Sequence, residues 1–245
     1  MPGDDKNPSP ATEAPKSTEA QSGAARRSGA EIEGTARVIA NFAVQHLQAA
    51  KLFRDQVIRL EAEHTADPDG DVFNEIRSYG GACLMSCAAG LEALINEFFI
   101  AHYSPLREKL GDFERQFWGK TGIENQTFLR KYQTALRLLG AKTFDQQGRP
   151  FRDVWALHEL RNALVHYKPT WDPEQHRATN LQDELGSRFA LSPFADASSH
   201  FVAVKCMSAG CARWAFQATL DFIADFDSRT HIDDNKMAGV HRLRD

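Results

Sequence analysis

Apolar residues recur at steps of three and four positions along much of this 245-residue chain. The pattern is clearest from Ser28 to His64, where one face of a long helix would carry Ile32, Ala36, Ile39, Ala43, Leu47, Ala50, Phe53, Val57 and Leu60. Ser28 and Glu31 match a capping box at the start of this helix. Further helices are predicted at about 72–103, 126–139, 151–167 and 198–226, with Gly140 ending the one before it.

No pair of segments alternates between apolar and polar residues in the way that predicts a hairpin. The expected fold class is therefore all-α: an up-down bundle of four main helices with a short helical insertion, which includes a helix near 106–117. Residues 169–196 are polar and contain prolines, so we expect a loop with short helical pieces.

The two ends of the chain differ from its middle. Residues 1–27 contain no aromatic side chain and are rich in Pro, Ser, Ala, Gly and charged residues, which predicts a disordered tail. We expect a helical domain over residues 28–228 and a loose C-terminal tail over residues 229–245. Such a domain is long enough to bury one sizeable core.

Charge is unevenly distributed. Residues 120–168 hold nine Lys or Arg and four Asp or Glu, a net of +5, which leaves −9 for the rest of a chain whose total is −4. A basic segment in an acidic protein is expected where the partner is a phosphate polymer such as RNA. Scattered charges that solvate helices would give the same count.

The four cysteines, at positions 83, 87, 206 and 211, lack the spacing of a zinc finger. Small buried thiols in close helix contacts are favoured over a metal site, and free thiols suggest a reducing cytoplasm. The first thirty residues have no apolar stretch typical of a signal peptide. Glu92, Asn96 and Glu97 interrupt the most apolar run, residues 82–101, which predicts a core helix and no membrane partner.

The segment LHELRNALVHYKP, residues 157–169, places strongly polar groups in the last two turns of a helix. On a wheel of ~100° per residue, one side can pack on the core and carries Leu157, Leu160 and Leu164. The opposite side mixes apolar and polar residues, namely Trp155, His158, Asn162, Val165 and His166, with Arg161 at its edge. A helix that is apolar on one face and half apolar on the other favours cover by a second subunit, so we predict a homodimer through this helix.

Pro169 disfavours helical geometry at Lys168, so the helix should end near Tyr167 with His166 in its final turn. A helix C-terminus favours the imidazolium form, whereas a nearby arginine opposes it, so His166 is expected to titrate near neutrality and to transfer protons. Arg161 is a forked donor suited to phosphate oxygens. Asn162, one turn before His166, could orient the imidazole or bind the substrate backbone.

A two-fold dimer could bring two such histidines and arginines to one phosphodiester. One histidine would remove the proton of a ribose 2′-hydroxyl, the other would protonate the leaving 5′-oxygen, and the arginines would stabilise the phosphorane. This chemistry needs no metal and no cofactor.

An arginine, a polar residue and a histidine late in a helix of an all-α bundle resemble the signature of the HEPN superfamily, here Arg161, Asn162 and His166. The stretch GLEALINEFF, residues 90–99, is similar to one in bacterial HEPN-like proteins. The resemblance implies a metal-independent RNA endonuclease acting as a dimer, often in toxin–antitoxin or antiviral systems, with an antitoxin or defence partner. Some HEPN toxins are controlled at a tyrosine two residues after the histidine, but this chain has Lys168 there.

Four further residues are candidates for substrate binding: His158, Lys168, Arg152 and Glu92. Glu92 could instead be exposed or, with Asn96, brace Arg161, and His158 could be a surface or interface residue. Arg161 and His166 could equally form a polar network that pins the dimer. A non-catalytic HEPN-like module for dimerisation or RNA binding in a larger system is therefore the alternative function, and a nucleotide-sensing regulator is a third.

Overall fold

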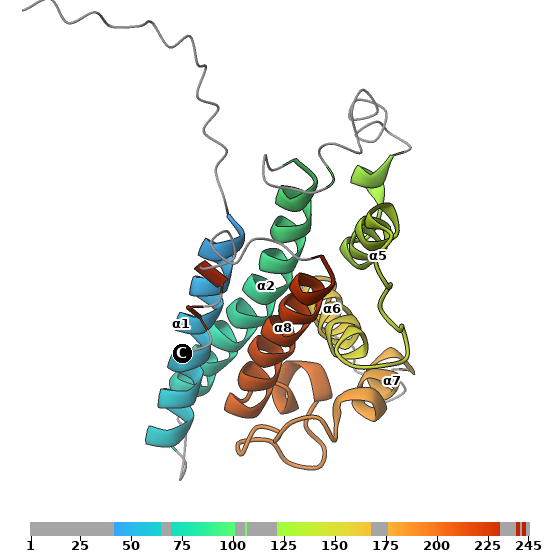
Figure 1. Cartoon of the computed structure of the whole chain (residues 1–245). Coiled ribbons are helices and arrows are strands. Elements are labelled where there is room, and N and C mark those ends of the chain that lie inside the picture. Colours follow the sequence, from blue (N-terminus) through green and yellow to red (C-terminus); the bar gives the residue numbers. More distant parts are fainter. Residues whose placement is uncertain are drawn as a thin grey trace, which may run out of the picture. The chain divides into compact units, whose positions relative to one another are not determined.

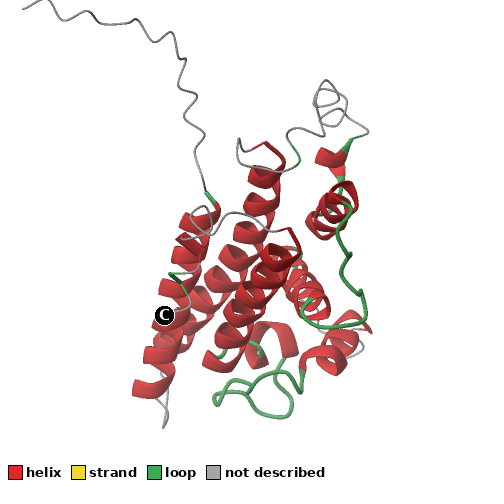
Figure 2. Ribbon diagram, viewed as in Figure 1, coloured by secondary structure: helices red, strands yellow, loops and turns green. Residues whose placement is uncertain are grey.

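The computed structural model describes residues 42–64, 70–100, 106, 122–167, 176–230, 239–240 and 242–243, with the backbone alone at residue 100 and residues 176–180. All regular elements within these ranges are helical and none is a strand, so the predicted all-α class is confirmed (Figure 2). The predicted tail at residues 1–27, the capping box at Ser28 and most of the predicted helix at 106–117 lie outside the described residues.

Helices α1 (Ala43–Glu63) and α2 (Gly70–Ile100) pack along each other. The predicted apolar face of α1 is buried at Ala43, Leu47, Ala50, Val57 and Leu60. Gly90 on α2 permits a close approach, because a Cβ atom there would lie only 2.7 Å from Cδ2 of Leu47. The lack of a Cβ atom at Gly90 thus allows α1 and α2 to come this close.

Helix α2 also contacts the helices that follow it along the chain. Within the described part of the chain, α2 is long and apolar enough to cross a membrane by length and composition. However, 61% of its apolar 18-residue stretch is buried inside the protein. Its buried residues include Leu84, Leu91, Ile95 and Phe98. This burial fits the prediction that residues 82–101 belong to a core helix.

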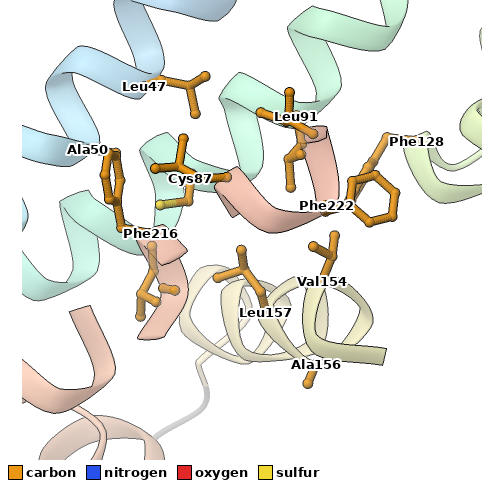
Figure 3. Close-up of a cluster of buried hydrophobic side chains, with 14 of the residues drawn as sticks. Leu47, Ala50, Cys87, Leu91, Phe128, Val154, Ala156, Leu157, Phe216 and Phe222 are labelled. Carbon is orange, nitrogen blue, oxygen red and sulfur yellow. The ribbon is translucent and has the colours of Figure 1, made fainter. Parts of the chain in front are cut away.

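Three more helices contribute to the core: α5 (Phe128–Leu139), α6 (Phe151–Val165) and α8 (Ala209–Thr230). A 3-10 turn, η2 (Ile123–Asn125), precedes α5, and Gly140 ends α5 as predicted, with a φ of 70° that glycine adopts readily. Side chains from α1, α2, α5, α6 and α8 gather in one cluster, which includes Leu47, Leu91, Phe128, Leu157 and Phe222 (Figure 3).

The single helix predicted over 198–226 is wrong. A π-helix, η3 (Phe201–Lys205), comes first, the chain leaves the helical path at Cys206–Ser208, and α8 starts at Ala209. Ser208 caps α8, because its Oγ accepts a hydrogen bond from the Cys211 N–H at 2.9 Å. The same hydroxyl donates to the Ala190 carbonyl at 2.8 Å, so a distant loop fixes where α8 begins.

The predicted loose tail also begins too early. Helix α8 continues to Thr230, and Val240 and Leu243 are buried in the core. A Cβ atom on Gly239 would lie 3.0 Å from Cγ2 of Val44, which places this part of the chain against α1. Residues 231–238, 241 and 244–245 lie outside the described residues.

The polar stretch between α6 and η3 contains one described helix, α7 (His176–Leu185), followed by a loop to His200. This arrangement agrees with the predicted loop with helical pieces. Helix α6 contacts α2, α8, α7 and η3, so its path is determined by several other elements (Figure 1).

Candidate functional site at the end of helix α6

The inner side of α6 anchors the candidate site. Leu157 and Leu160 are fully buried, and Leu164 packs against the core at its edge, as the helical wheel predicted. Burial of each such side chain stabilises the fold by roughly 1.5–3 kcal/mol. The other side of α6 therefore presents its polar residues from a firmly held helix.

Helix α6 ends at Val165, and His166 occupies the C-cap position, one residue beyond the final turn in which it was predicted. The His166 N–H donates to the Asn162 carbonyl at 3.0 Å, which closes the helix. The His166 side chain is exposed, and so are its apolar neighbours Val165, at 47%, and Tyr167, at 41%. A large ligand could reach the imidazole from solvent.

Arg161, Asn162 and His158 form a chain of side-chain hydrogen bonds. Nη1 of Arg161 donates to Oδ1 of Asn162 at 2.9 Å. Nδ2 of Asn162 lies 3.0 Å from Nε2 of His158, one turn earlier on α6. The amide of Asn162 thus binds His158, and not His166, which was one of the two roles that the sequence suggested for it.

The imidazole of His158 is half-buried against α5. Its ring meets that of Phe128 edge-on, with centroids 5.1 Å apart. Burial lowers the pKa of His158, and Arg161 lowers it further, while the carboxylates of Glu159 and Glu92 act in the opposite direction. Because burial is the largest effect, the neutral imidazole is favoured.

Arg161 keeps its charge available. Among the ion pairs of the described residues, none involves Arg161, whose guanidinium bonds the neutral amide of Asn162. A guanidinium held by a neutral group can still bind an anion through its other donors.

Arg152, predicted to bind substrate, is engaged elsewhere. Its guanidinium bonds both carboxylate oxygens of Glu184 on α7, at 2.8 and 3.1 Å, and lies 4.0 Å above the Trp155 ring. Arg188 bonds Asp153 as well as Glu184, and these arginines lower the pKa of Glu184, chiefly through the hydrogen bond from Arg152. This cluster fastens α7 to the first half of α6.

The remaining candidates are placed as follows. Glu92 is exposed on α2, and its charge acts on His158. Asn96 accepts a hydrogen bond from Nζ of Lys131 at 2.9 Å, so its oxygen is engaged by α5 and not by Arg161. Lys168 lies outside the described residues.

His200, which lies beside the end of α6, was not among the residues predicted for the site. Its ring meets that of Tyr167 edge-on at 5.5 Å, and its Nδ1 accepts the Ala203 N–H at 3.2 Å to cap η3. Burial lowers the pKa of His200. A histidine just before an apolar run was the available signal, and it is too weak to find such a residue.

The cysteines are buried and free, as predicted. The Cys87 thiol raises the pKa of Cys83, and burial raises that of Cys211, so both thiols stay protonated. Within the described ranges, no group of three or more His, Cys, Asp or Glu is arranged to hold a metal ion.

Comparison with protein-family models, with curated proteins and with solved structures gives no match for this chain.

Proposed function

We propose that this protein is a metal-independent RNA endonuclease of HEPN type, with Arg161 and His166 as catalytic residues and Asn162 in support. The observation that carries the proposal is the end of α6, where an arginine held by a neutral amide lies five positions before an exposed C-cap histidine. Phosphodiester chemistry without a metal needs these two kinds of group, a fixed cation and a titratable base.

The active form proposed is a homodimer that brings two copies of the α6 end to one RNA strand. Support comes from the exposed apolar side chains of Val165 and Tyr167 beside His166, which a partner subunit could cover. The fold proposed is a HEPN-like up-down bundle, supported by the packing of α1, α2, α6 and α8 around a shared core.

In the reaction proposed, one His166 takes the proton of a ribose 2′-hydroxyl, and the 2′-oxygen forms a bond to phosphorus. The phosphorane carries negative charge that Arg161 stabilises. The bond from phosphorus to the 5′-oxygen then breaks, and the second His166 donates a proton to that oxygen. The products are a 2′,3′-cyclic phosphate and a 5′-hydroxyl, with no net redox change.

The test is cleavage of several RNAs in EDTA by purified protein, with product ends analysed. We expect wild type to leave 2′,3′-cyclic phosphate and His166→Ala to lose at least about 100-fold in rate. His64→Ala is the matched control, because His64 occupies the C-cap of α1 as His166 does that of α6. Equal rates for wild type and His166→Ala, or no cleavage by either as a folded dimer, would sink the proposal.

The alternative is a non-catalytic HEPN-like module that binds RNA or dimerises. The bond between Asn162 and His158 favours it, because a side chain bound to His158 is not positioned to orient His166. RNA binding without cleavage, lost in Arg161→Ala and retained in His166→Ala, would support this second function.

A further inference from the structure

The hydrogen bonds of Asn162 determine where the proton of neutral His158 lies. A guanidinium donates and never accepts, so the Asn162 atom that faces Arg161 must be the carbonyl oxygen. The amide NH2 group then faces His158, and it can only donate. Nε2 of His158 must therefore accept, which places the imidazole proton on Nδ1.

Protonation of His158 is incompatible with this arrangement. An imidazolium carries a proton on both nitrogens, so Nε2–H would face the NH2 group of Asn162. Rotation of the amide would relieve that contact, but it would turn the NH2 group toward the Arg161 donor. One of the two hydrogen bonds must break in either case.

The charged groups around His158 come from two helices. On α6, Arg161 opposes protonation and Glu159 favours it, and on α2 Glu92 favours it. The element that covers the ring is α5, through the uncharged side chain of Phe128. The neutral form of His158 therefore depends mainly on its burial. The opposing charges of Glu159, Arg161 and Glu92 have smaller effects.

We propose that neutral His158 is a positioning residue, which holds Arg161 through Asn162, and that protonation of His158 releases the arginine. The consequence for RNA cleavage rests on the function proposed above, whereas the bonding arrangement does not. The candidate site would thus contain a built-in requirement for one uncharged histidine, which acts through Asn162 on Arg161.

Three substitutions separate the roles of the ring. His158→Gln can offer its Oε1 as an acceptor to Asn162, but its amide is not protonated in the pH range in which an imidazole is. His158→Phe keeps an aromatic ring against Phe128 and removes the acceptor. Asn162→Asp presents an oxygen toward both neighbours, so it should hold Arg161 while favouring the imidazolium form of His158.

The first measurement uses no RNA. Long-range nitrogen–proton NMR spectra of the wild-type protein at pH 7.5 should show an unprotonated Nε2 and a protonated Nδ1 for His158. As the pH falls, the guanidinium signals of Arg161 should report faster rotation, and in His158→Gln they should not change. A neutral His158 with its proton on Nε2, or an Arg161 signal indifferent to His158, would overturn the proposal.

The second measurement is the pH profile of cleavage. Protonation of the base His166 lowers kcat at low pH in every variant, so the quantity compared is the ratio of the kcat of His158→Gln to that of wild type. This ratio should rise as the pH falls, with little change in KM, and His158→Phe should lose roughly tenfold or more at every pH. Asn162→Asp should move the acid limb upward in pH. A His158→Gln profile identical to that of wild type would count against the positioning role.

The two proposals fail in different ways. Absence of cleavage together with the expected NMR result would remove the ribonuclease function and leave the control of Arg161 by His158 supported. Robust cleavage together with the wrong imidazole tautomer would do the reverse. His64→Gln, at the end of α1, serves as the control for a histidine replaced outside the site.

Discussion

His200 caps η3 and also packs its ring against Tyr167, and the two contributions to stability can be measured separately. Its Nδ1 accepts the Ala203 N–H and so caps η3, next to the end of α6. His200→Ala should lower the free energy of unfolding by about 1 kcal/mol, as loss of a helix cap does, whereas His200→Asn can supply an oxygen in place of Nδ1 and should lose less. Urea denaturation of both variants gives the comparison. Equal losses would show that the ring contact, and not the cap, stabilises this junction.

Glu97 provides a second test at the level of one residue. Its Oε1 accepts the N–H groups of Phe42 and Ala43 at 2.7 and 3.0 Å, at the start of α1, while Oε2 is buried with no hydrogen-bond partner among the described atoms. Burial raises the pKa of Glu97. A raised folded pKa means that the folded state binds the proton more tightly than the unfolded state.

The contribution of Glu97 should therefore be most favourable below its unfolded pKa and be lost as the pH rises through the folded pKa. Glu97→Gln keeps an acceptor for the two N–H groups and removes the titration. The difference in unfolding free energy, variant minus wild type, should become more positive between pH 4.5 and 7. Glu124→Gln on an exposed side chain controls for loss of a carboxylate. A constant or falling difference would contradict the expectation.

The polar residues of α6 show what sequence spacing can and cannot decide. Asn162 lies four positions after His158 and four before His166, so helical spacing allows it to reach either. The structure ends the helix at Val165, and His166 leaves the path on which a four-residue spacing brings side chains together. Which histidine binds Asn162 thus depends on a helix boundary, the feature that a single sequence predicts least well.

At the scale of elements, local signals were sufficient for α1 and α5. The burial of α1 follows from apolar spacing within one helix, and α5 ends at a glycine that adopts a positive φ. The start of α8 was missed because its cause is distant. Ser208 bonds Ala190, and a Cβ atom on Gly210 would lie only 2.3 Å from the Ala190 oxygen. Ala190 lies outside residues 198–226, so no pattern within that segment could predict where α8 begins.

The contact between α1 and α2 can be tested at Gly90. A Cβ atom there would lie 2.7 Å from Cδ2 and 2.9 Å from Cγ of Leu47, too close without a shift of the side chain or the helix. Gly90→Ala should cost about 1–3 kcal/mol of unfolding free energy through overpacking. Leu47→Ala alone should cost about 2–5 kcal/mol through the cavity that it leaves.

Combined in one protein, the two substitutions should cost less than the sum of their separate effects, because the new methyl group enters space that Leu47 vacates. Thermal or urea unfolding of the four proteins in this cycle measures the coupling. Gly81→Ala, on the same helix, is the control, since a Cβ atom there meets nothing within 4 Å. Strict additivity would mean that α1 and α2 do not pack as closely at Gly90 as the structure has them.

At the scale of the whole molecule, the basic segment is less available than its sequence implies. Lys131 is buried and its Nζ bonds Asn96 on α2, and Arg152 pairs with Glu184 on α7. Part of the net charge of residues 120–168 is therefore used inside the fold. The sequence count could not show this, because the partners on α2 and α7 lie outside the segment. Among the basic residues of 120–168, Arg161 is the one that the proposed catalysis requires.

The C-terminal part of the chain offers a test of how far the folded unit extends. Val240 and Leu243 are buried at 3% and 7% exposure, and the segment meets α1 at Gly239 and Val44. Removal of residues 231–245 should therefore lower the free energy of unfolding by about 2 to 4 kcal/mol, from the loss of two buried aliphatic side chains. Urea denaturation followed by circular dichroism measures the change.

A full-length protein with Val240→Ser and Leu243→Ser should reproduce most of that loss, since the cause is apolar burial and not chain length. Gln217→Ser, on the exposed side of α8, should change the unfolding free energy by no more than about 0.5 kcal/mol. Equal stability of the truncated and complete proteins would mean that the segment contributes nothing to the fold. A destabilised truncation with an unaffected double variant would instead place the stabilising contact at other residues of the segment.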